Sequence, residues 1–127
     1  MMKIDAVGVT SSDLKKTVAF YTLLGFEFGE VKEGEDHVEP KASNGSARLM
    51  IDSKELITDL IGEKPKPGNA STFAIGYDLA QEVDEVARKV KEAGFVLIKE
   101  PWDAFWGQRY AVVQDPDGYK VDLYAGL

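Results

Sequence analysis

The stretch that decides the fold runs from Pro101 to Tyr124 and reads PWDAFWGQRYAVVQDPDGYKVDLY. Its DPDG segment, Asp115 to Gly118, is typical of a tight turn, because proline fixes φ and glycine tolerates positive φ. The YKVDLY segment after the turn alternates apolar and polar residues, as a strand with two different faces does. The expected faces are Tyr119, Val121 and Leu123 on one side, and Lys120, Asp122 and Tyr124 on the other. The stretch therefore predicts a β-hairpin whose apolar face packs on a helix.

Aromatic residues gather just before this turn, in a loop and at the start of a strand. They are Trp102, Phe105, Trp106 and Tyr110. The return strand adds one carboxylate, Asp122, on its polar face. A lone charge among aromatic rings is typical of one wall of a ligand pocket. The same aromatics are equally suited to close one end of the sheet as core, and the sequence leaves both interpretations open.

Composition excludes several classes of function. The chain has 127 residues and a net charge of −7 with no basic patch, which argues against nucleic-acid binding because phosphates are repelled. It has no cysteine, so disulfides, thiolate nucleophiles and cysteine metal sites are excluded. The opening MMKIDAVGVT lacks the apolar run of a signal peptide, and no segment approaches membrane-spanning length. We expect a cytoplasmic protein that binds neither nucleic acid nor membrane.

The order of predicted elements repeats in the two halves of the chain. The first half predicts a strand at 4–10, a helix capped by Ser11 or Ser12 with Asp13 in its first turn, and strands at 26–31, about 37–42 and 47–52. The second half predicts a strand at 71–77, a helix at 81–93, a strand at 95–99 and the hairpin. Gly25-Phe26 and Gly94-Phe95 stop the two helices at the same place. Pro40 marks its strand as an edge strand.

This repetition predicts an α+β fold made of two tandem βαβββ modules. The first module covers residues 1–52 and the second covers residues 71–127. The linker, residues 53–70, contains a short possible helix at 54–61 and then EKPKPGN, whose prolines and glycine are typical of a connection.

Two segments, VGVTSSDLKKTVAFYTLLGFEF and FWGQRYAVVQDPDGYKVDLY, resemble the vicinal oxygen chelate superfamily. This superfamily includes glyoxalase I, extradiol dioxygenases and bleomycin-resistance proteins. The resemblance covers nearly the whole chain, 1–127, as a single domain. It implies that the two modules form a curled mixed sheet around a cleft, and it implies a homodimer.

The resemblance also locates four cleft-facing strand positions at which superfamily enzymes hold a metal with His, Glu and related residues. They fall at Ala6, Met50, Phe73 (with Ile75 as the alternative register) and Asp122. The first three side chains are poor ligands for zinc or nickel, which need imidazole or carboxylate donors. We therefore expect no metal and no cofactor. The single histidine, His37, lies in the charged GEDHVEP segment and is expected to be a solvated loop or edge-strand residue.

Other chemistry finds little support in the sequence. A Ser–His–Asp triad would need His37, and neither a nucleophile elbow nor a glycine-rich phosphate loop is present. Asp122 is a possible general base if burial raises its pKa. The alternative role for Asp122 is a structural carboxylate bonded to Arg109 or Lys120.

The resemblance then favours its binding branch, in which bleomycin-resistance-like proteins sequester cationic, aromatic drugs without a metal and so confer antibiotic resistance. The expected function is metal-independent binding of a cationic or aromatic small molecule. The expected ligand-binding residues are Met50, Phe73, Tyr77, Trp102, Phe105, Trp106 and Asp122. One alternative is a glyoxalase-like lyase or isomerase. Another is a regulatory or interaction domain that retains only the fold.

Overall fold

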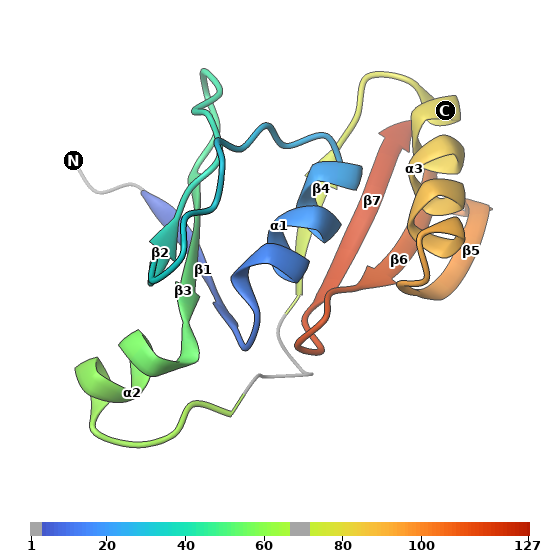
Figure 1. The fold of residues 1–127 in the computed structure, drawn as a ribbon. Helices are drawn as coiled ribbons and strands as arrows, with labels where there is room; N and C mark the ends of the chain where they lie inside the picture. The colour runs from blue at the N-terminus through green and yellow to red at the C-terminus, as the bar shows by residue number, and fades with distance from the viewer. Residues whose placement is uncertain (1–3, 67–71) are drawn as a thin grey trace. The chain divides into compact units, whose positions relative to one another are not determined.

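The computed structural model describes residues 4–66 and 72–127. The chain divides into two compact units, Met1–Pro67 and Gly68–Leu127. This division falls inside the predicted linker, and residues 67–70 of that linker lie outside the described residues. Each unit combines a small sheet with helices, so the α+β class predicted from the sequence is confirmed (Figure 1). No helix in the described ranges is both long and apolar enough to cross a membrane.

In its described part, residues 4–66, the first unit has three strands and two helices. In chain order they are β1 (Ala6–Ser11), α1 (Leu14–Leu23), β2 (His37–Val38), β3 (Arg48–Ser53) and α2 (Lys54–Ile61). The strand order in its sheet is β1-β3-β2, with β1 parallel and β2 antiparallel to β3. The strand next to Pro40 is therefore an edge strand, as predicted.

The start of α1 differs from the prediction by one or two residues. Asp13 is the N-cap, with extended backbone, and its carboxylate accepts a hydrogen bond from Lys16 N. Ser11, one of the predicted caps, instead ends β1 and shares a buried 2.6 Å hydrogen bond with the Thr17 hydroxyl. The helix ends as predicted, because Gly25 adopts a φ of 114° that disfavours other residues.

The core of the first unit lies between α1 and one face of its sheet. The buried residues are Phe20, Tyr21 and Leu24 from the end of α1, and Val9, Leu49 and Ile51 from β1 and β3. The rings of Phe20 and Tyr21 meet edge to face at 5.0 Å, a favourable arrangement for aromatic quadrupoles.

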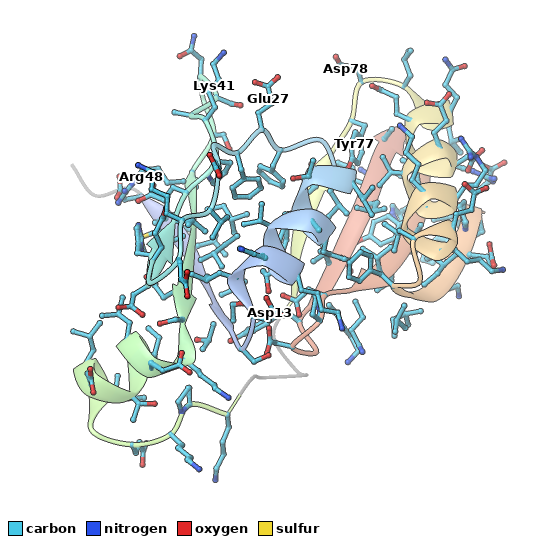
Figure 2. All side chains as sticks on the ribbon, in the orientation of Figure 1. Asp13, Glu27, Lys41, Arg48, Tyr77 and Asp78 are labelled. Atoms are coloured by element: carbon cyan, nitrogen blue, oxygen red, sulfur yellow. The ribbon has the colours of Figure 1, made fainter. Side chains whose placement is uncertain are left out.

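One predicted strand is absent from this unit. Residues 26–31 form no strand, and β2 has two residues where the sequence predicted about six. A backbone hydrogen bond joins these two segments, from Lys41 N to Glu27 O at 2.8 Å, between two residues labelled in Figure 2. Pro40 has no N–H to extend the ladder, which explains why pairing stops before it. The first unit is therefore β-α-β-β followed by α2.

The second unit is a complete βαβββ module, as predicted. Its elements are β4 (Thr72–Gly76), α3 (Ala80–Glu92), β5 (Val96–Ala104), β6 (Gln108–Gln114) and β7 (Lys120–Gly126). The strand order is β4-β7-β6-β5, with β4 parallel to β7 and the other neighbours antiparallel. The DPDG turn joins β6 to β7. There the carboxylate of Asp115 accepts hydrogen bonds from Asp117 N and Tyr119 N, and Gly118 has a φ of 94°.

Helix α3 covers one face of this second sheet (Figure 1). Its buried residues are Val83, Val86, Ala87 and Val90, and the buried strand residues are Ala111, Val113, Val121, Leu123 and Ala125. The strand residues between them point to the other side. That opposite side, named here the distal face, carries Lys99, Trp102, Tyr110, Val112, Lys120, Asp122 and Tyr124.

Candidate functional site

Strand register builds a row of aromatic side chains across the distal face. Trp102 of β5 pairs with Tyr110 of β6, which pairs with Tyr124 of β7. The Tyr110 and Tyr124 rings are stacked, with centroids 6.3 Å apart and planes 25° apart. Trp102 meets Tyr110 edge to face at 5.4 Å. Aromatic pairs across strands stabilise a sheet and also hold each ring in a fixed orientation.

The turn between β5 and β6 adds two more rings to this row. Trp106 lies 5.3 Å from Tyr110 and 6.1 Å from Trp102, both edge to face. Phe105 packs on Trp106 at 5.0 Å. Trp106 retains 49% of its surface area exposed and Phe105 retains 97%. These two residues are therefore not part of the buried core.

Gly76 of β4 makes room for the last ring of the row. It pairs with Tyr124, and a Cβ placed on Gly76 would lie 2.9 Å from the Tyr124 hydroxyl oxygen and 3.0 Å from its ring carbon. A side chain at this position would push the ring away. The glycine thus lets Tyr124 lie across β4.

A carboxylate lies beside the aromatic row. The Tyr110 hydroxyl donates a 2.5 Å hydrogen bond to Asp122 Oδ2. Burial, together with this bond to a carboxylate, raises the pKa of Tyr110 to about 12, so the phenol stays protonated and remains a donor at neutral pH. Within the described ranges, Asp122 takes part in no ion pair. Its negative charge is therefore oriented but not neutralised.

The alternative role for Asp122 was a structural bond to Arg109 or Lys120, and the structure does not show the bond to Arg109. Arg109 lies on the α3 side of the sheet, where Nε donates to Asp84 at 2.8 Å and Nη1 donates to Asp103 at 3.1 Å. Asp122 lies on the opposite face. It pairs with Val112, which is three residues from Arg109 on β6, and successive strand residues point to opposite faces.

A cation already lies against one of the rings. The Lys99 ammonium is 4.2 Å from the centre of the Trp102 ring. This distance is well within the range of a cation–π interaction.

Four of the seven predicted ligand-binding residues meet on or next to the distal face: Trp102, Phe105, Trp106 and Asp122. Phe73 does not join them, because it pairs with Val121 and so lies on the side that α3 covers. The alternative register, Ile75, pairs with Leu123 and lies on the same side. Tyr77 follows the end of β4, and burial, together with the nearby charge of Glu82 in α3, raises its pKa. The prediction that Phe73 faces the cleft with Asp122 is therefore wrong.

Sequence reasoning missed Tyr124 and Lys99 as members of this site. Alternation in YKVDLY already placed Tyr124 on the face of Asp122, so that signal was present. The position of Lys99 depends on an irregularity in β5 that the sequence does not reveal.

Met50, the seventh predicted residue, belongs to the first unit. Its partner is Gly8 of β1, and Ala6 lies two residues earlier on the same face. The expectation that Ala6 and Met50 share a face is therefore confirmed. Neither side chain offers the nitrogen or oxygen donor that zinc or nickel prefers. The residues at the metal positions implied by the resemblance thus do not fit a divalent metal, and among the described residues no other cluster of three His, Cys, Asp or Glu could hold one.

His37 shares this face, on the edge strand β2 where the sequence placed it. Its Nδ1 lies 2.5 Å from Asp52 Oδ1 and its Nε2 lies 2.8 Å from Glu39 Oε2. Carboxylates only accept hydrogen bonds, so both contacts are hydrogen bonds only when the imidazole is protonated and both ring nitrogens donate. The bond to Asp52 is the main reason that the pKa of His37 is raised, and the bond to Glu39 adds to it. Arg48, labelled in Figure 2, completes the network by bonding Glu39 and Asp5.

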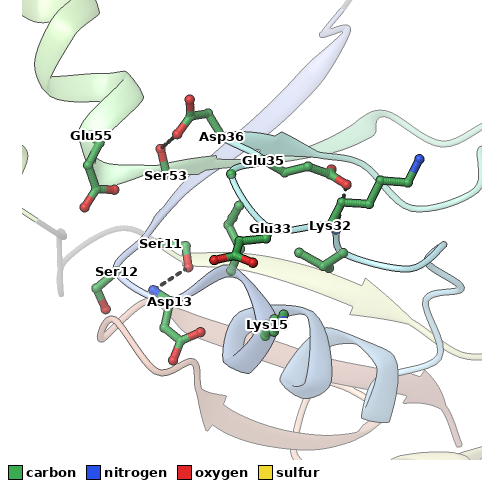
Figure 3. A pocket seen from close by; sticks show the side chains of 13 residues that line it. Ser11, Ser12, Asp13, Lys15, Lys32, Glu33, Glu35, Asp36, Ser53 and Glu55 are labelled. Carbon is green, nitrogen blue, oxygen red and sulfur yellow. Dashed lines mark hydrogen bonds between the residues drawn. The ribbon is translucent and has the colours of Figure 1, made fainter.

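The first unit also has a surface hollow of about 460 Å³ where α1 and α2 begin (Figure 3). Its lining is strongly acidic, with Asp13, Glu33, Glu35, Asp36 and Glu55 among the contributors. The helix N-termini are already capped, since Asp13 accepts from Lys16 N and Ser53 accepts from Leu56 N. Capped ends and surrounding carboxylates make this hollow unfavourable for an anion.

Comparison with known proteins identifies the family. The family model described as Glyoxalase/Bleomycin resistance protein/Dioxygenase superfamily matches residues 3–123. No curated protein matches the chain.

Several solved structures share the fold. A hypothetical protein from S. aureus is 23% identical, with a TM-score of 0.79 over 98% of this chain and 95% of that one. A family enzyme from Burkholderia phytofirmans is 19% identical, with a TM-score of 0.81 over 99% and 100% of the two chains. A lactoylglutathione lyase from Agrobacterium tumefaciens is 21% identical, with a TM-score of 0.68 over 98% and 93%. At these identities the likeness shows the fold, and together with the family match it shows that the chain belongs to the glyoxalase/bleomycin resistance protein/dioxygenase superfamily.

Proposed function

We propose that the protein binds a planar, cationic small molecule on the distal face without a metal, as bleomycin-resistance proteins do. The observation that carries this proposal is the row of Trp102, Tyr110 and Tyr124, extended by the exposed Trp106, beside the unpaired charge of Asp122. The rings offer a flat apolar surface on which a planar ligand can stack. The carboxylate of Asp122 offers a negative charge that attracts a cationic ligand.

The expected energies are sufficient for useful affinity. An aromatic pair contributes about 0.5–1.5 kcal/mol beyond its area burial. A cation over a tryptophan face contributes about 0.5–2 kcal/mol. Two or three such contacts, together with the apolar area that they bury, are consistent with micromolar binding, which corresponds to about −8 kcal/mol.

A glyoxalase-like lyase or isomerase is the second candidate, since one structural neighbour is a lactoylglutathione lyase. The Tyr110–Asp122 pair is the observation that supports a lyase or isomerase, because Asp122 could act as a base without a metal. One feature disfavours this candidate. Ala6 and Met50 provide no metal donors. A regulatory domain that retains only the fold is the third candidate.

The test is a titration with N-methylquinolinium, a flat aromatic cation, near neutral pH. The two tryptophans of the chain, Trp102 and Trp106, both belong to the site. Their fluorescence therefore reports on the site, and we expect the probe to quench it and to raise the melting temperature. A ligand at about 100 times its dissociation constant stabilises the folded state by roughly 2.7 kcal/mol, which is measurable.

Two variants and one control make this test specific. Asp122→Asn should weaken the cation about tenfold and leave quinoline, its uncharged analogue, nearly unchanged. Trp106→Ala should weaken both probes. Asp59→Asn removes the same charge from α2 of the first unit and should change neither. No binding of either probe, or a metal-stimulated conversion of methylglyoxal and glutathione, would contradict the proposal.

A further inference from the structure

An irregularity in β5 brings Lys99 and Trp102 to the same face of the sheet. They are three residues apart, so in a regular strand they would point to opposite sides. Their partners on β6, Val112 and Tyr110, are only two residues apart, and the register shifts between Lys99 and Trp102. The extra residue of this bulge returns Trp102 to the side of Lys99. Pro101, which has no N–H to donate, lies inside the irregular stretch, where strands tolerate proline.

The Trp102 ring is the partner that the bulge gives to Lys99. The ammonium lies 4.2 Å from the ring centre, and among the described residues Lys99 forms no ion pair. Asp122 lies on the same face, two strands away across Val112. The cation therefore lies on the aromatic surface although a carboxylate is available on the same face.

This inference rests on the proposed function and concerns which ligands the site admits. We propose that Lys99 is a tethered cation that occupies the Trp102 ring face in the free protein, and that a ligand must displace it to stack there. Lys99 is then a specificity-determining residue. When a ligand only stacks on Trp102, the protein loses the contact between Lys99 and Trp102, and this loss offsets part of the binding energy. A ligand that also brings a cation to Asp122 gains a further contact, one that Lys99 does not make.

The size of the effect follows from the strength of an exposed cation–π contact. Such a contact is worth about 0.5–1 kcal/mol, which corresponds to about two- to fivefold in affinity. Lys99→Met keeps the apolar stem and removes the ammonium. It should therefore tighten the binding of both N-methylquinolinium and uncharged quinoline by about two- to fivefold.

Two further variants separate displacement from a general change of charge. Lys99→Arg keeps a cation that stacks on the ring, so both affinities should stay within about twofold of the original protein. Lys89→Met removes one positive charge from α3, on the other side of the sheet. It should leave quinoline unchanged and alter the cation only slightly.

The experiment is a fluorescence titration of the full chain and these three variants with both probes. It is accompanied by NMR of the Lys99 side chain. In the free protein the ring current of Trp102 should shift the Lys99 methylene protons upfield, and saturating N-methylquinolinium should remove this shift.

The outcomes separate this inference from the proposed function. Equal affinities of the original protein and Lys99→Met for both probes would overturn the role of Lys99 and leave the proposed function standing. The role of Lys99 would also be overturned if Lys99→Met tightened binding of the cation alone, by no more than Lys89→Met does. An upfield shift of the Lys99 protons that persists in the complex would overturn it as well. If neither probe binds to any variant, the proposed function fails and this inference fails with it.

Discussion

At the scale of single residues, the Tyr110–Asp122 hydrogen bond is the contact that orients the charge of the site. The donor and the acceptor are both partly buried, and the bond is 2.5 Å long. Hydrogen bonds to charged groups contribute about 1.5–3 kcal/mol when well shielded, and partial exposure reduces this. We expect Tyr110→Phe to lower the free energy of unfolding by about 1–2 kcal/mol.

A double-mutant cycle in urea measures this contact directly. Tyr110→Phe, Asp122→Asn and the double variant should show a coupling free energy of about 1 kcal/mol, because Tyr110→Phe removes the bond and Asp122→Asn replaces its charged acceptor with a neutral amide oxygen. A coupling indistinguishable from zero would mean that the bond contributes nothing to stability. If Asp122→Asn alone unfolds the chain, Asp122 is structural and the ligand site loses its charge.

Gly76 gives a second prediction at this scale. Gly76→Ala places a Cβ within 3 Å of the Tyr124 ring and hydroxyl, so the ring must move. Overpacking of this kind costs about 1–3 kcal/mol. Gly126→Ala is the matched control, since Gly126 also lies in the second sheet and nothing lies within 4 Å of its added Cβ. Thermal unfolding should separate the two, and Tyr124→Leu should rescue Gly76→Ala. Equal stability of the two alanine variants would show that the ring yields without cost.

At the scale of elements, the network of His37 holds the short strand β2 to β3. The pKa of His37 is raised, mainly by Asp52, so its contribution is complete below the unfolded value of 6.5 and is lost as pH rises through the raised folded pKa. The pKa of Glu39 is lowered, mainly by His37, so its contribution is present above 4.5 and is lost as pH falls through the lowered folded pKa. The attachment of β2 should therefore be strongest between these two limits.

NMR titration tests this pH dependence, because the chain has one histidine and hence one imidazole signal. Asp52→Asn should lower the pKa of His37 more than Glu39→Gln does, since the Asp52 bond is the larger cause. The stability change is expected to be below about 1 kcal/mol, because the His37 side chain is 42% exposed and solvent screens the pair. A His37 pKa that responds equally to both variants would contradict the order of causes.

Elements with strong local signals were predicted well, and those fixed by distant contacts were not. Residues 54–61 form α2 as predicted, because Ser53 caps the helix and Gly62 ends it with a φ of 81°. Residues 26–31 were predicted as a strand but form none, because a segment becomes a strand only where a partner strand is present to accept its hydrogen bonds. Strand β5 continues past Pro101 to Ala104, because an irregular strand at the edge of a sheet tolerates proline.

The site was predicted only in part for the same reason. Alternation within YKVDLY correctly grouped Asp122 with Tyr124, because both lie on one strand. The side on which Phe73 lies depends on the register between β4 and β7, and a shift of one residue exchanges the two faces. A single sequence does not fix that register.

At the scale of the whole molecule, the residues at the metal-ligand positions implied by the resemblance lead to a prediction about metal content. We expect purified protein to contain no stoichiometric zinc, nickel or iron, because Ala6 and Met50 have no suitable donor atoms. Added zinc or nickel should also give no lyase activity with methylglyoxal and glutathione. Elemental analysis and a rate measurement check both parts. About one metal ion per chain would reverse the preference for a binding protein over an enzyme.

The last prediction concerns assembly, since the resemblance implies a homodimer and each sheet has open edges. In the second sheet the nine-residue β5 is an outer strand, and it exposes the apolar Val96 and Ile98. In the first sheet one of the two outer strands, β2, has only two residues and is flanked by Pro40 and charged side chains, which disfavour pairing. We therefore expect β5 to contribute to the contact between two copies.

Light scattering at micromolar concentrations should give a mass of twice the 14.0 kDa of one chain. Ile98→Lys places a charge on the exposed edge and should raise the monomer fraction. Ile61→Lys, the same change at an exposed position of α2, should not. A mass of 14.0 kDa throughout would exclude the dimer. A dimer that Ile98→Lys leaves intact would place the contact on another surface, because a lysine buried without a partner in an interface core weakens association strongly.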